Sequence, residues 1–505
     1  MKLGIISFFV LVIGTSVALA DEDILMRTIS IKADSIKKAD LLDSLSVKYN
    51  IHFSYNPQAL EAQKHISIIA ENLLLIEVLY RLIPDNSLAI RTVDNQVIFY
   101  PTRELPDTTA SIKKIRITGQ ITGQNGIQPV PYCHITLVGK ALGTISNTQG
   151  KFSVLIPDSL ANDTLAFSCL GYETKYLPIA QTDSLPLNIK LQTHIFKLQT
   201  INITRYNPED IFRNYDQNYK RNYETEYTLF EAFYREITIE NNHYTNISEA
   251  VLNILKAPYH NEYRNDLVKF IKGRKGTETS PIGDIRLTLM GGPFYITKLD
   301  VVKNKESFLD AENRKFYTYK FERTTLINNR KTAIVEFSPI YTLRNILFEG
   351  TLYFDIETWG IARVEFRYTR QGLREARQTL IYKKPRHVKV DPDKLEYTVQ
   401  YKHIDSKWYL QSARSFFDIK INNRETREKT NFSSTSEILT TSIEKGSFEK
   451  FARHDIFRPN EIFTEKISTY DATFWENYNV ITPEDELTNA LKNFEEKNLV
   501  VTYTH

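Results

Sequence analysis

The feature that most constrains the fold is a stretch between Gly119 and Thr174, in which short alternating runs are separated by turn residues. Apolar residues at every second position, such as Ile135 and Leu137, are typical of a strand with one buried face. Glycine and asparagine residues lie between the runs, and these residue types can take the positive φ angles that tight turns require. The stretch therefore predicts one small β-domain, and its pattern identifies a module rather than a reaction.

This stretch resembles the carboxypeptidase regulatory-like domain found in envelope proteins of the Bacteroidetes. The shared features are an opening glycine, a proline-marked strand, a Gly-Thr hairpin and a closing Gly-Tyr-Glu. The matching residues are Gly119, Ile121, Pro131, Ile135, Leu137, Gly139, Gly143, Thr144, Asn147, Gly150, Phe152, Gly171, Tyr172 and Glu173. Tyr132 and Ser146 depart from the family pattern, where glycine and threonine are usual. The resemblance implies a non-catalytic, seven-stranded β-sandwich of the transthyretin (prealbumin) type over residues 115–203.

Length and composition indicate several domains that are mainly β. The chain has 505 residues, and 12% of them are aromatic, which favours sheet over helix. Its 64 lysines and arginines nearly balance 61 aspartates and glutamates. Because there is no large excess of positive charge, we do not expect the chain to bind nucleic acid.

The N-terminus has the pattern of a secretory signal peptide. Lys2 precedes an apolar run, and Ala18-Leu19-Ala20 forms a small-residue cleavage site before Asp21. A membrane anchor is the alternative, but the run is shorter than the ~20 residues that a helical span needs. We therefore expect residues 1–20 to be removed and the mature chain to be exported. Its expected location is the periplasm or the periplasmic face of the outer membrane.

Between the signal peptide and the sandwich, the apolar period alternates between that of a strand and that of a helix. Alternation at residues 29–31 and 51–55 predicts strands, and helical spacing at residues 36–46 and 73–82 predicts helices. The pattern resembles the short N-terminal domain of secretins and TonB-dependent transducers, a small α+β domain that docks or signals in the periplasm. We assign this domain to residues 21–103, with a generic α+β spacer as the alternative.

Residues 204–505 have the pattern of a large antiparallel β-sheet domain with flanking helices. One helix is expected from Asn207-Pro208, where an N-cap asparagine precedes a proline in the first turn, and another from Thr482-Pro483. The stretch 348–368 alternates apolar and polar residues as an antiparallel hairpin does. This hairpin resembles an element of lipoprotein-carrier sheets, which implies a curved sheet that shelters a lipophilic ligand.

The chain has two cysteines, Cys133 and Cys169, and both lie on expected core faces of the sandwich. Two interpretations stay open. The cysteines are either buried thiols or, in an oxidising compartment, a disulfide, provided that their Cα atoms lie within ~7 Å of each other. Two sulfurs without a nearby histidine pair do not indicate a metal site, and no cofactor is expected.

A basic block between Arg363 and Lys389 contains nine lysines and arginines but only two acidic residues. The candidate surface residues within it are Arg374, Arg377, Lys383 and Lys384. These side chains could make a peripheral contact with the anionic headgroups of the outer membrane, where each charge contributes ~1 kcal/mol. The alternative is a solvated sheet face whose charges discourage edge pairing.

Catalytic motifs are not apparent in the sequence. None of the ten histidines begins a zinc-peptidase motif, and neither a G-x-S-x-G elbow nor a Walker-type loop occurs. Glu231, Glu236 and Glu249 are candidate carboxylates for glycoside hydrolysis, but their spacing defines no geometry.

We therefore expect a non-catalytic adaptor or binding protein of the cell envelope. Its N-terminal domain would dock, and its C-terminal sheet would bind an envelope protein or a lipophilic ligand. The alternative is an envelope hydrolase that acts on carbohydrate or peptide, with its site in the C-terminal half.

Overall fold

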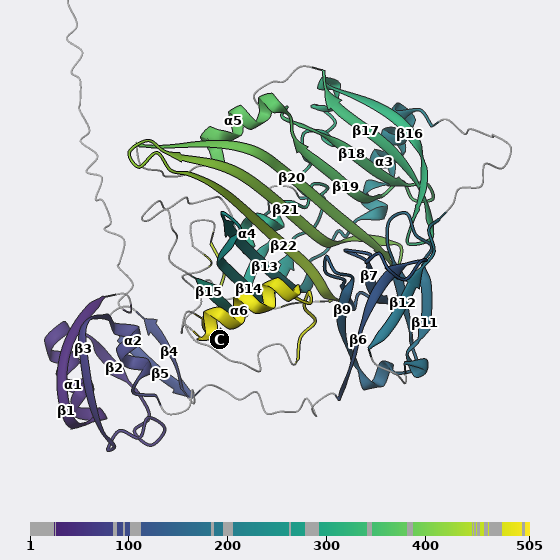
Figure 1. Cartoon of the computed structure of the whole chain (residues 1–505). Coiled ribbons are helices and arrows are strands. Elements are labelled where there is room, and N and C mark those ends of the chain that lie inside the picture. Colours follow the sequence, from purple (N-terminus) through teal and green to yellow (C-terminus); the bar gives the residue numbers. More distant parts are fainter. Residues whose placement is uncertain are drawn as a thin grey trace, which may run out of the picture. The chain divides into compact units, whose positions relative to one another are not determined.

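Strands dominate the structure, a computed structural model, so the expected mainly β fold class is confirmed (Figure 1). Two compact units, Met1–Ile112 and Lys113–His505, are described separately. The described residues are 25, 27–83, 88–93, 96–101, 113–182, 186–194, 206–261, 264–277, 292–340, 346–380, 387–446, 448, 451, 455–458, 463, 477–496 and 500–504.

The first unit is a small α+β fold, as the changing apolar period predicts. Its elements are β1 (Thr28–Lys37), α1 (Lys38–Tyr49), β2 (His52–Ser54), β3 (His65–Leu74), α2 (Leu75–Tyr80), β4 (Leu88–Val93) and β5 (Gln96–Pro101). β1 pairs with β3, and β5 lies between β2 and β4 in a second sheet. Leu41 of α1 and Leu79 of α2 share one core with Ile29 and Phe99 of the strands. The link to the secretin-like family stays a prediction.

The second unit begins with a β-sandwich of seven strands, the number that the sequence predicts. One sheet is β11 (Lys175–Pro178), β10 (Thr164–Ser168), β7 (His134–Leu137) and β8 (Gly143–Ile145); the other is β12 (Leu187–Leu191), β6 (Lys114–Gly123) and β9 (Lys151–Pro157). Gly150 occupies a turn before β9 at a φ of 72°, and a Cβ there would lie 2.3 Å from the Ile121 carbonyl oxygen. Glycine is therefore required at this turn.

An 11-stranded antiparallel sheet makes up most of the second unit. In spatial order its strands are β16 (Tyr317–Ile327), β17 (Arg330–Pro339), β18 (Phe348–Asp355), β19 (Ile361–Tyr368), β20 (Val388–Ile404), β21 (Lys407–Asn423), β22 (Lys429–Lys445), β13 (Thr228–Glu240), β14 (His243–Lys256), β15 (Leu267–Thr277) and β23 (Val500–Thr504). Strands β20, β21 and β22 run side by side through Figure 1. β18 and β19 form the expected hairpin, with Phe348 opposite Tyr368.

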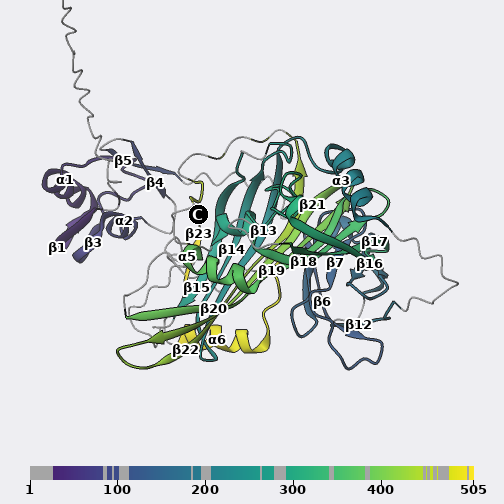
Figure 2. The same ribbon diagram turned by 90° about the horizontal axis from the view of Figure 1, so that it is seen from above.

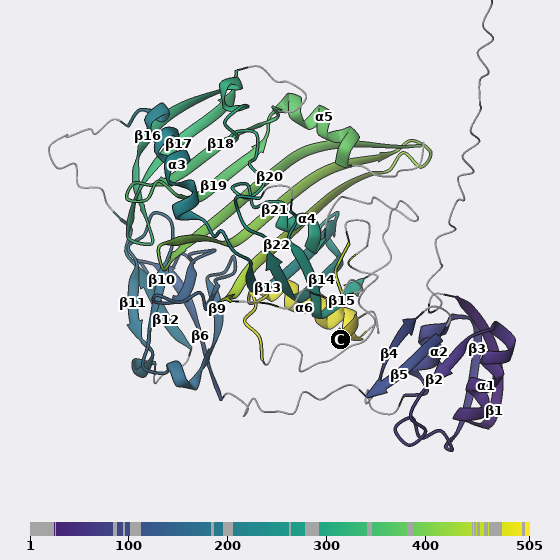
Figure 3. The ribbon, with the colours of Figure 1, turned by 180° about the vertical axis from the view of Figure 1, so that it is seen from behind.

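The chain itself covers one face of this sheet, which we call the inner face. Helix α3 (Pro208–Asn222) lies in front of β16–β19 in Figure 3 and behind them in Figure 1. Its Phe212 packs edge-to-face on Phe354, with ring centres 5.4 Å apart. The helix begins where the sequence predicts, because the side chain of Asn207 accepts a hydrogen bond of 3.1 Å from the backbone N–H of Glu209.

Helix α4 (Pro293–Thr297) and the segment 298–316 also pack on the inner face. Phe308 from this segment is fully buried and stacks on Phe337 of β17, with ring centres 4.4 Å apart. Helix α5 (Arg370–Leu380) connects β19 to β20. The inner face between β16 and β21 is therefore filled largely by aromatic side chains of the same chain.

The opposite face, which we call the outer face, carries the sandwich and the last helix. Ile145 of the sandwich packs on Phe233 of β13, and Leu487 of α6 (Asp485–Glu496) packs on Ile247 of β14. Seen from above in Figure 2, α3 and α6 lie on opposite sides of the sheet. The two coverings of the sheet thus come from different parts of the sequence.

Candidate functional site

A row of mainly polar and charged side chains crosses the outer face of the sheet. Each member is the backbone partner of the next, through ten neighbouring strands. From β16 to β15 the row is Lys320, Glu336, Thr351, Glu365, Thr398, Arg414, Glu437, Arg235, Glu249 and Arg274. Residues directly opposite each other in a sheet point to the same face. We call this line of side chains the polar row.

The half of the polar row nearest β15 is a chain of ion pairs. Arg235 Nε lies 2.7 Å from Glu249 Oε1, and Arg235 Nη1 lies 3.4 Å from Glu437 Oε1. On its other side, Glu249 Oε2 lies 2.6 Å from Arg274 Nε. Arg235 and Glu249 are each only 1% exposed. Because the charges alternate in sign along the row, each buried charge lies next to one of opposite sign. A charge buried in a low-dielectric interior is unfavourable without such a partner.

These pairs set the protonation of the buried carboxylates. Burial alone would raise the pKa of Glu249, but Arg274 and Arg235 hold it below its usual range. Burial raises the pKa of Glu437, which has a longer contact with Arg235. Glu249 is therefore an ion-paired carboxylate at neutral pH rather than a proton donor.

The C-terminal segment 477–484 binds both the polar row and the sandwich. Arg235 Nη2 donates a hydrogen bond of 2.5 Å to the Ile481 carbonyl, and Thr144 Oγ1 of the sandwich donates one of 2.9 Å to the Val480 carbonyl. Asn479 makes two further bonds, of 2.6 and 2.9 Å, with the backbone of Leu155. These contacts cover the ion-paired half of the row.

Over β16–β20 the polar row lies in an open trough of about 760 Å³. Side chains of this row and its neighbours line the trough: Thr318, Lys320, Glu336, Ser338, Glu349, Thr351, Glu365, Arg367, Glu396 and Thr398. Four of them are carboxylates and two are cations, so the lining side chains themselves carry a net negative charge; Arg363, outside the lining, pairs with Glu365. Gly350 lies in the floor, where a Cβ would come within 2.1 Å of the Glu365 carbonyl oxygen.

The ion pairs of the trough differ from those of the covered half because water reaches them. The side chains of Lys320 and Arg367 are 73% and 62% exposed. Arg367 Nε lies 2.9 Å from Glu349 Oε1, and this pair is partly solvated. Exposed pairs contribute only ~0–1 kcal/mol each. A polar ligand can therefore exchange with them at small cost.

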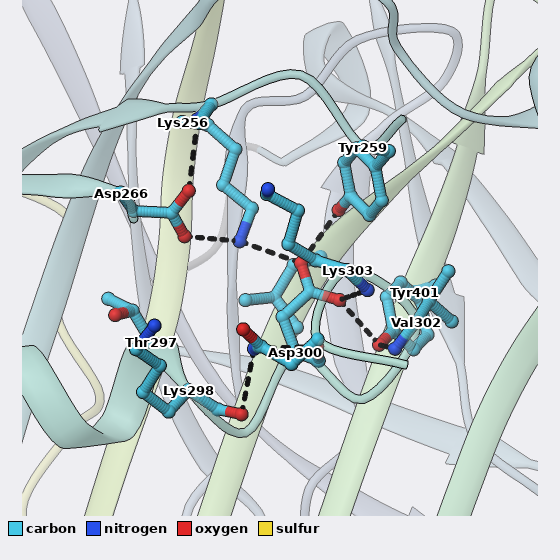
Figure 4. Close-up of polar contacts among 12 residues, drawn as sticks. Lys256, Tyr259, Asp266, Thr297, Lys298, Asp300, Val302, Lys303 and Tyr401 are labelled. Carbon is cyan, nitrogen blue, oxygen red and sulfur yellow. Dashed lines mark hydrogen bonds and ion pairs between the residues drawn. The ribbon is translucent and has the colours of Figure 1, made fainter. Parts of the chain in front are cut away.

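A second charged cluster surrounds Asp300, which is fully buried, and Figure 4 shows its contacts. Lys256 Nζ lies 2.7 Å from Asp266 Oδ2 and 2.7 Å from Asp300 Oδ2. The hydroxyls of Tyr259 and Tyr401 each donate a 2.8 Å hydrogen bond to Asp300. Burial opposes the charge of Lys256, but the two aspartates outweigh it and raise the pKa of Lys256.

This cluster joins β14, β20 and the loop that follows α4. Asp300 is fully buried and accepts hydrogen bonds from Tyr259, next to β14, and from Tyr401 of β20. The network therefore holds the segment 298–316 against the inner face. The lipophilic ligand expected from the lipoprotein-carrier resemblance would need this space. Among the described residues, the inner face is instead occupied by Phe308 and its neighbours.

A smaller cavity of about 100 Å³ lies where the sandwich meets the sheet. Its lining includes His134 and Cys169 of the sandwich and Arg363 and Gln400 of the sheet. His134 Nε2 is hydrogen-bonded to Gln400 Oε1, and within the described part of the chain its Nδ1 has no hydrogen-bond partner. Burial lowers the pKa of His134 to about 4. The imidazole is therefore neutral at physiological pH.

The residues singled out from the sequence lie in separate places. Cys133 and Cys169 are free thiols, the first buried and the second partly buried. Arg374 is exposed on α5. The side chain of Arg377, and all of Lys383 and Lys384, lie outside the described residues.

Three other cations of the basic block, Arg363, Arg367 and Lys389, form ion pairs. Arg363 Nη2 lies 2.6 Å from Glu365 Oε1, and Lys389 Nζ lies 2.7 Å from Asp391 Oδ2. Arg363 and Lys389 belong to different strands, β19 and β20, and each has an acidic neighbour on its own strand.

The three candidate catalytic glutamates do not converge. Glu249 lies between two arginines of the polar row. Glu236 accepts a 2.7 Å hydrogen bond from the Tyr234 hydroxyl, and Glu231 accepts one of 2.9 Å from Thr441 Oγ1. Among the described residues, no group of three histidine, cysteine or acidic side chains is arranged to hold a metal ion.

Sequence reasoning did not identify the trough as a site. The alternation in β18 and β19 indicates that Glu349, Thr351, Glu365 and Arg367 share one polar face. The contributions of β16, β17 and β20 depend on the pairing of more distant strands. No signal in a single sequence reports that register.

Comparison with known proteins identifies the sandwich. Residues 117–203 match the family model described as CarboxypepD_reg-like domain, which confirms the predicted regulatory-like module. TonB-dependent receptor P39 of Formosa agariphila is 35% identical over 77 residues, which are 15% of this chain and 7% of the receptor. The chain thus matches only a small part of that relative.

Two solved structures show distant likenesses. A domain from Vibrio parahaemolyticus, described as an outer membrane lipoprotein-sorting protein, is 14% identical at a TM-score of 0.24 and covers 47% of this chain and 93% of its own. A DUF1329 family protein from Desulfovibrio piger is 9% identical at a TM-score of 0.20. The match covers 46% of this chain and 92% of that protein. TM-scores this low carry no argument about the chain. Separately, no helix of the described residues is long and apolar enough to span a bilayer.

Replacing Arg235 by methionine tests the ion-paired half of the polar row. The substitution leaves Glu249 and Glu437 buried with fewer cations, so we expect the free energy of unfolding to fall by ~3–5 kcal/mol. Arg213→Met is the matched control, because the side chain of Arg213 is 62% exposed and, among the described residues, its ion pair is with exposed Asp210. Its expected loss is under ~1 kcal/mol. Equal losses in urea denaturation of the full chain would contradict the buried pairing.

His134 predicts an acid-dependent loss of stability. Its pKa of about 4 in the folded chain lies below the ~6.5 of an unfolded histidine, so the unfolded chain takes up the proton first as the pH falls. Relative to His134→Gln, the wild-type chain should lose about 3 kcal/mol of unfolding free energy between pH 7 and pH 4. The measurement is denaturation at several pH values. Parallel stability curves for the two proteins would refute the assignment.

Proposed function

We propose that the chain is a non-catalytic, envelope-associated binding protein whose ligand site is the trough over β16–β20. The supporting observation is the difference between the two halves of the polar row. Over one half, the charges are buried and paired with each other; over the other half, exposed pairs line an open trough of about 760 Å³. Exposed pairs can exchange for ligand groups, whereas the buried pairs serve the fold.

The lining of the trough favours an extended, polar ligand with cationic groups. Neighbouring strands are ~4.8 Å apart, so the five strands of the trough span ~19 Å. Glutamates outnumber cations, and hydroxyls such as Thr351 and Thr398 add hydrogen-bonding groups. An amino-sugar oligomer has this complementary chemistry. A lipophilic ligand would instead have to strip water from the charged lining, which is unfavourable.

The proposal retains the domain organisation expected from the sequence. Residues 1–20 would direct export, residues 21–103 would dock to an envelope partner, and residues 115–203 would join this domain to the sheet domain, 204–505. The partial match to a TonB-dependent receptor supports an envelope location. The non-catalytic assignment is supported by the regulatory nature of the sandwich family and by the separation of Glu231, Glu236 and Glu249.

Titration calorimetry with three hexasaccharides of different charge tests the ligand site. We expect a glucosamine hexamer to bind most tightly, maltohexaose less tightly and a galacturonate hexamer least, because the trough has a net negative charge. Thr351→Trp fills the floor and should weaken glucosamine-hexamer binding at least ~10-fold, or ~1.4 kcal/mol.

The control for this test is Thr426→Trp, at an exposed turn between β21 and β22. It adds the same side chain outside the trough and should leave binding unchanged. Preference for the anionic hexamer, or equal effects of the two tryptophans, would contradict the proposed site.

The contact of Arg374, Arg377, Lys383 and Lys384 with anionic lipid is a separate proposal, supported by the exposed position of Arg374 on α5. It predicts that replacing all four residues by glutamine abolishes binding to phosphatidylglycerol-containing vesicles, while neutral phosphatidylcholine vesicles bind neither form. Vesicle co-sedimentation measures this. Unchanged binding of the glutamine variant would contradict this proposal, and the basic block would then be a solvated surface.

A further inference from the structure

The register of the sandwich sets its two cysteines opposite each other. Strands β7 and β10 pair antiparallel, and the ladder ends with His134 opposite Ser168. Continuing this register by one residue beyond the ladder, on each of the two strands, sets Cys133 opposite Cys169. The pairing of β7 with β10 has no register shift that would displace these positions.

The hydrogen-bond pattern shows which kind of pair the cysteines form. The backbone N–H of Val138 donates a 3.0 Å bond to the Thr164 carbonyl, so Val138 and Thr164 are a hydrogen-bonded pair. Hydrogen-bonded and non-hydrogen-bonded pairs alternate along an antiparallel ladder. Cys133 lies five positions from Val138, and an odd separation along the strand means that the two residues belong to pairs of different kinds. Cys133 and Cys169 are therefore at a non-hydrogen-bonded position.

This position suits a covalent bond between the two strands. Cα atoms of a non-hydrogen-bonded pair are ~4.5 Å apart, and their side chains approach more closely than at the alternate positions. Disulfides require Cα separations of ~4.4–6.8 Å. Residues opposite each other also point to the same face, and both cysteines belong to the sandwich core.

Within the part of the chain that the structure describes, each thiol makes only a weak hydrogen bond. Cys133 Sγ lies 3.8 Å from the His134 carbonyl oxygen, and Cys169 Sγ lies 3.7 Å from the Pro131 carbonyl oxygen. Thiols are weak donors, so these contacts oppose rotation of the side chains only slightly. Cys169 is also partly exposed and lines the cavity between the sandwich and the sheet.

We propose that Cys133 and Cys169 are a redox-active pair that closes into a cross-strand disulfide when the chain meets a disulfide oxidant. The Cys169 thiolate attacks the oxidant's disulfide, forms a mixed disulfide and releases one thiolate. The Cys133 thiolate then attacks the Cys169 sulfur of the mixed disulfide and releases the second thiolate of the oxidant. The two cysteines lose two protons and two electrons, and the oxidant's disulfide is reduced to two thiols.

Closure is slow at neutral pH and faster in alkali. Burial raises the pKa of Cys169 to about 11 and raises that of Cys133 as well, so little reactive thiolate is present at pH 7. The bond would fix the end of the sandwich sheet that faces the 11-stranded sheet. Tyr132, adjacent to Cys133, lies there with its ring centre 5.1 Å from the Arg414 guanidinium.

Oxidation of the full chain with oxidised glutathione at alkaline pH tests the proposal. After the reagent is removed, the intact mass should be ~2 Da lower, corresponding to the two protons and two electrons lost. Iodoacetamide should then label neither cysteine in the unfolded chain. Prior reduction with dithiothreitol should restore labelling at both, and the oxidised chain should unfold at a higher temperature than the reduced one.

Single variants separate closure from reaction with glutathione alone. Cys133→Ser should stop at the mixed disulfide on Cys169, with glutathione retained, and Cys169→Ser should stay reduced in the folded chain. Retained glutathione on the wild-type chain, or iodoacetamide labelling of either cysteine after oxidation, would overturn the proposal. Because the mass measurement uses the wild-type chain, poor folding of a variant does not affect the result.

Discussion

The alternation of side chains across the two faces of one long sheet is the constraint on which the rest of this structure depends. It sets ten side chains in a row on the outer face, and their environment then differs along the sheet. Where the sandwich and segment 477–484 cover the row, every buried charge has an opposite neighbour. Where the row is open, water solvates weaker pairs. One register thus produces both a domain junction and a candidate ligand site.

The inner face obeys a different constraint, because its apolar side chains must be removed from water. Helix α3 and segment 298–316 do this with aromatic rings, and the network around Asp300 holds the segment in place. Burying a charged group such as Lys256 is unfavourable unless hydrogen bonds and opposite charges compensate for the lost hydration. Asp266 and Asp300 supply the opposite charges for Lys256, and the hydroxyls of Tyr259 and Tyr401 donate hydrogen bonds to Asp300. The cluster therefore stabilises the packing of the segment.

Local patterns in the sequence predicted local structure well. Asn207-Pro208 marked the start of α3, the alternation from Phe348 marked the β18–β19 hairpin, and turn residues marked the sandwich. The polar row could not be predicted in this way, because Arg235 and Glu437 are 202 residues apart and only strand pairing brings them together. The lipophilic ligand was inferred from one hairpin and stays a prediction; that hairpin carried no information about Phe308, which packs on the inner face.

Carboxylate labelling with a carbodiimide and an amine, followed by mass spectrometry, tests the central claim most directly. The account predicts rapid modification of Glu336, Glu349, Glu365 and Glu396 in the folded chain. It also predicts protection of Glu249 and Glu437 until the chain unfolds. Similar labelling rates for the two groups would contradict the division of the polar row into an open and a covered half.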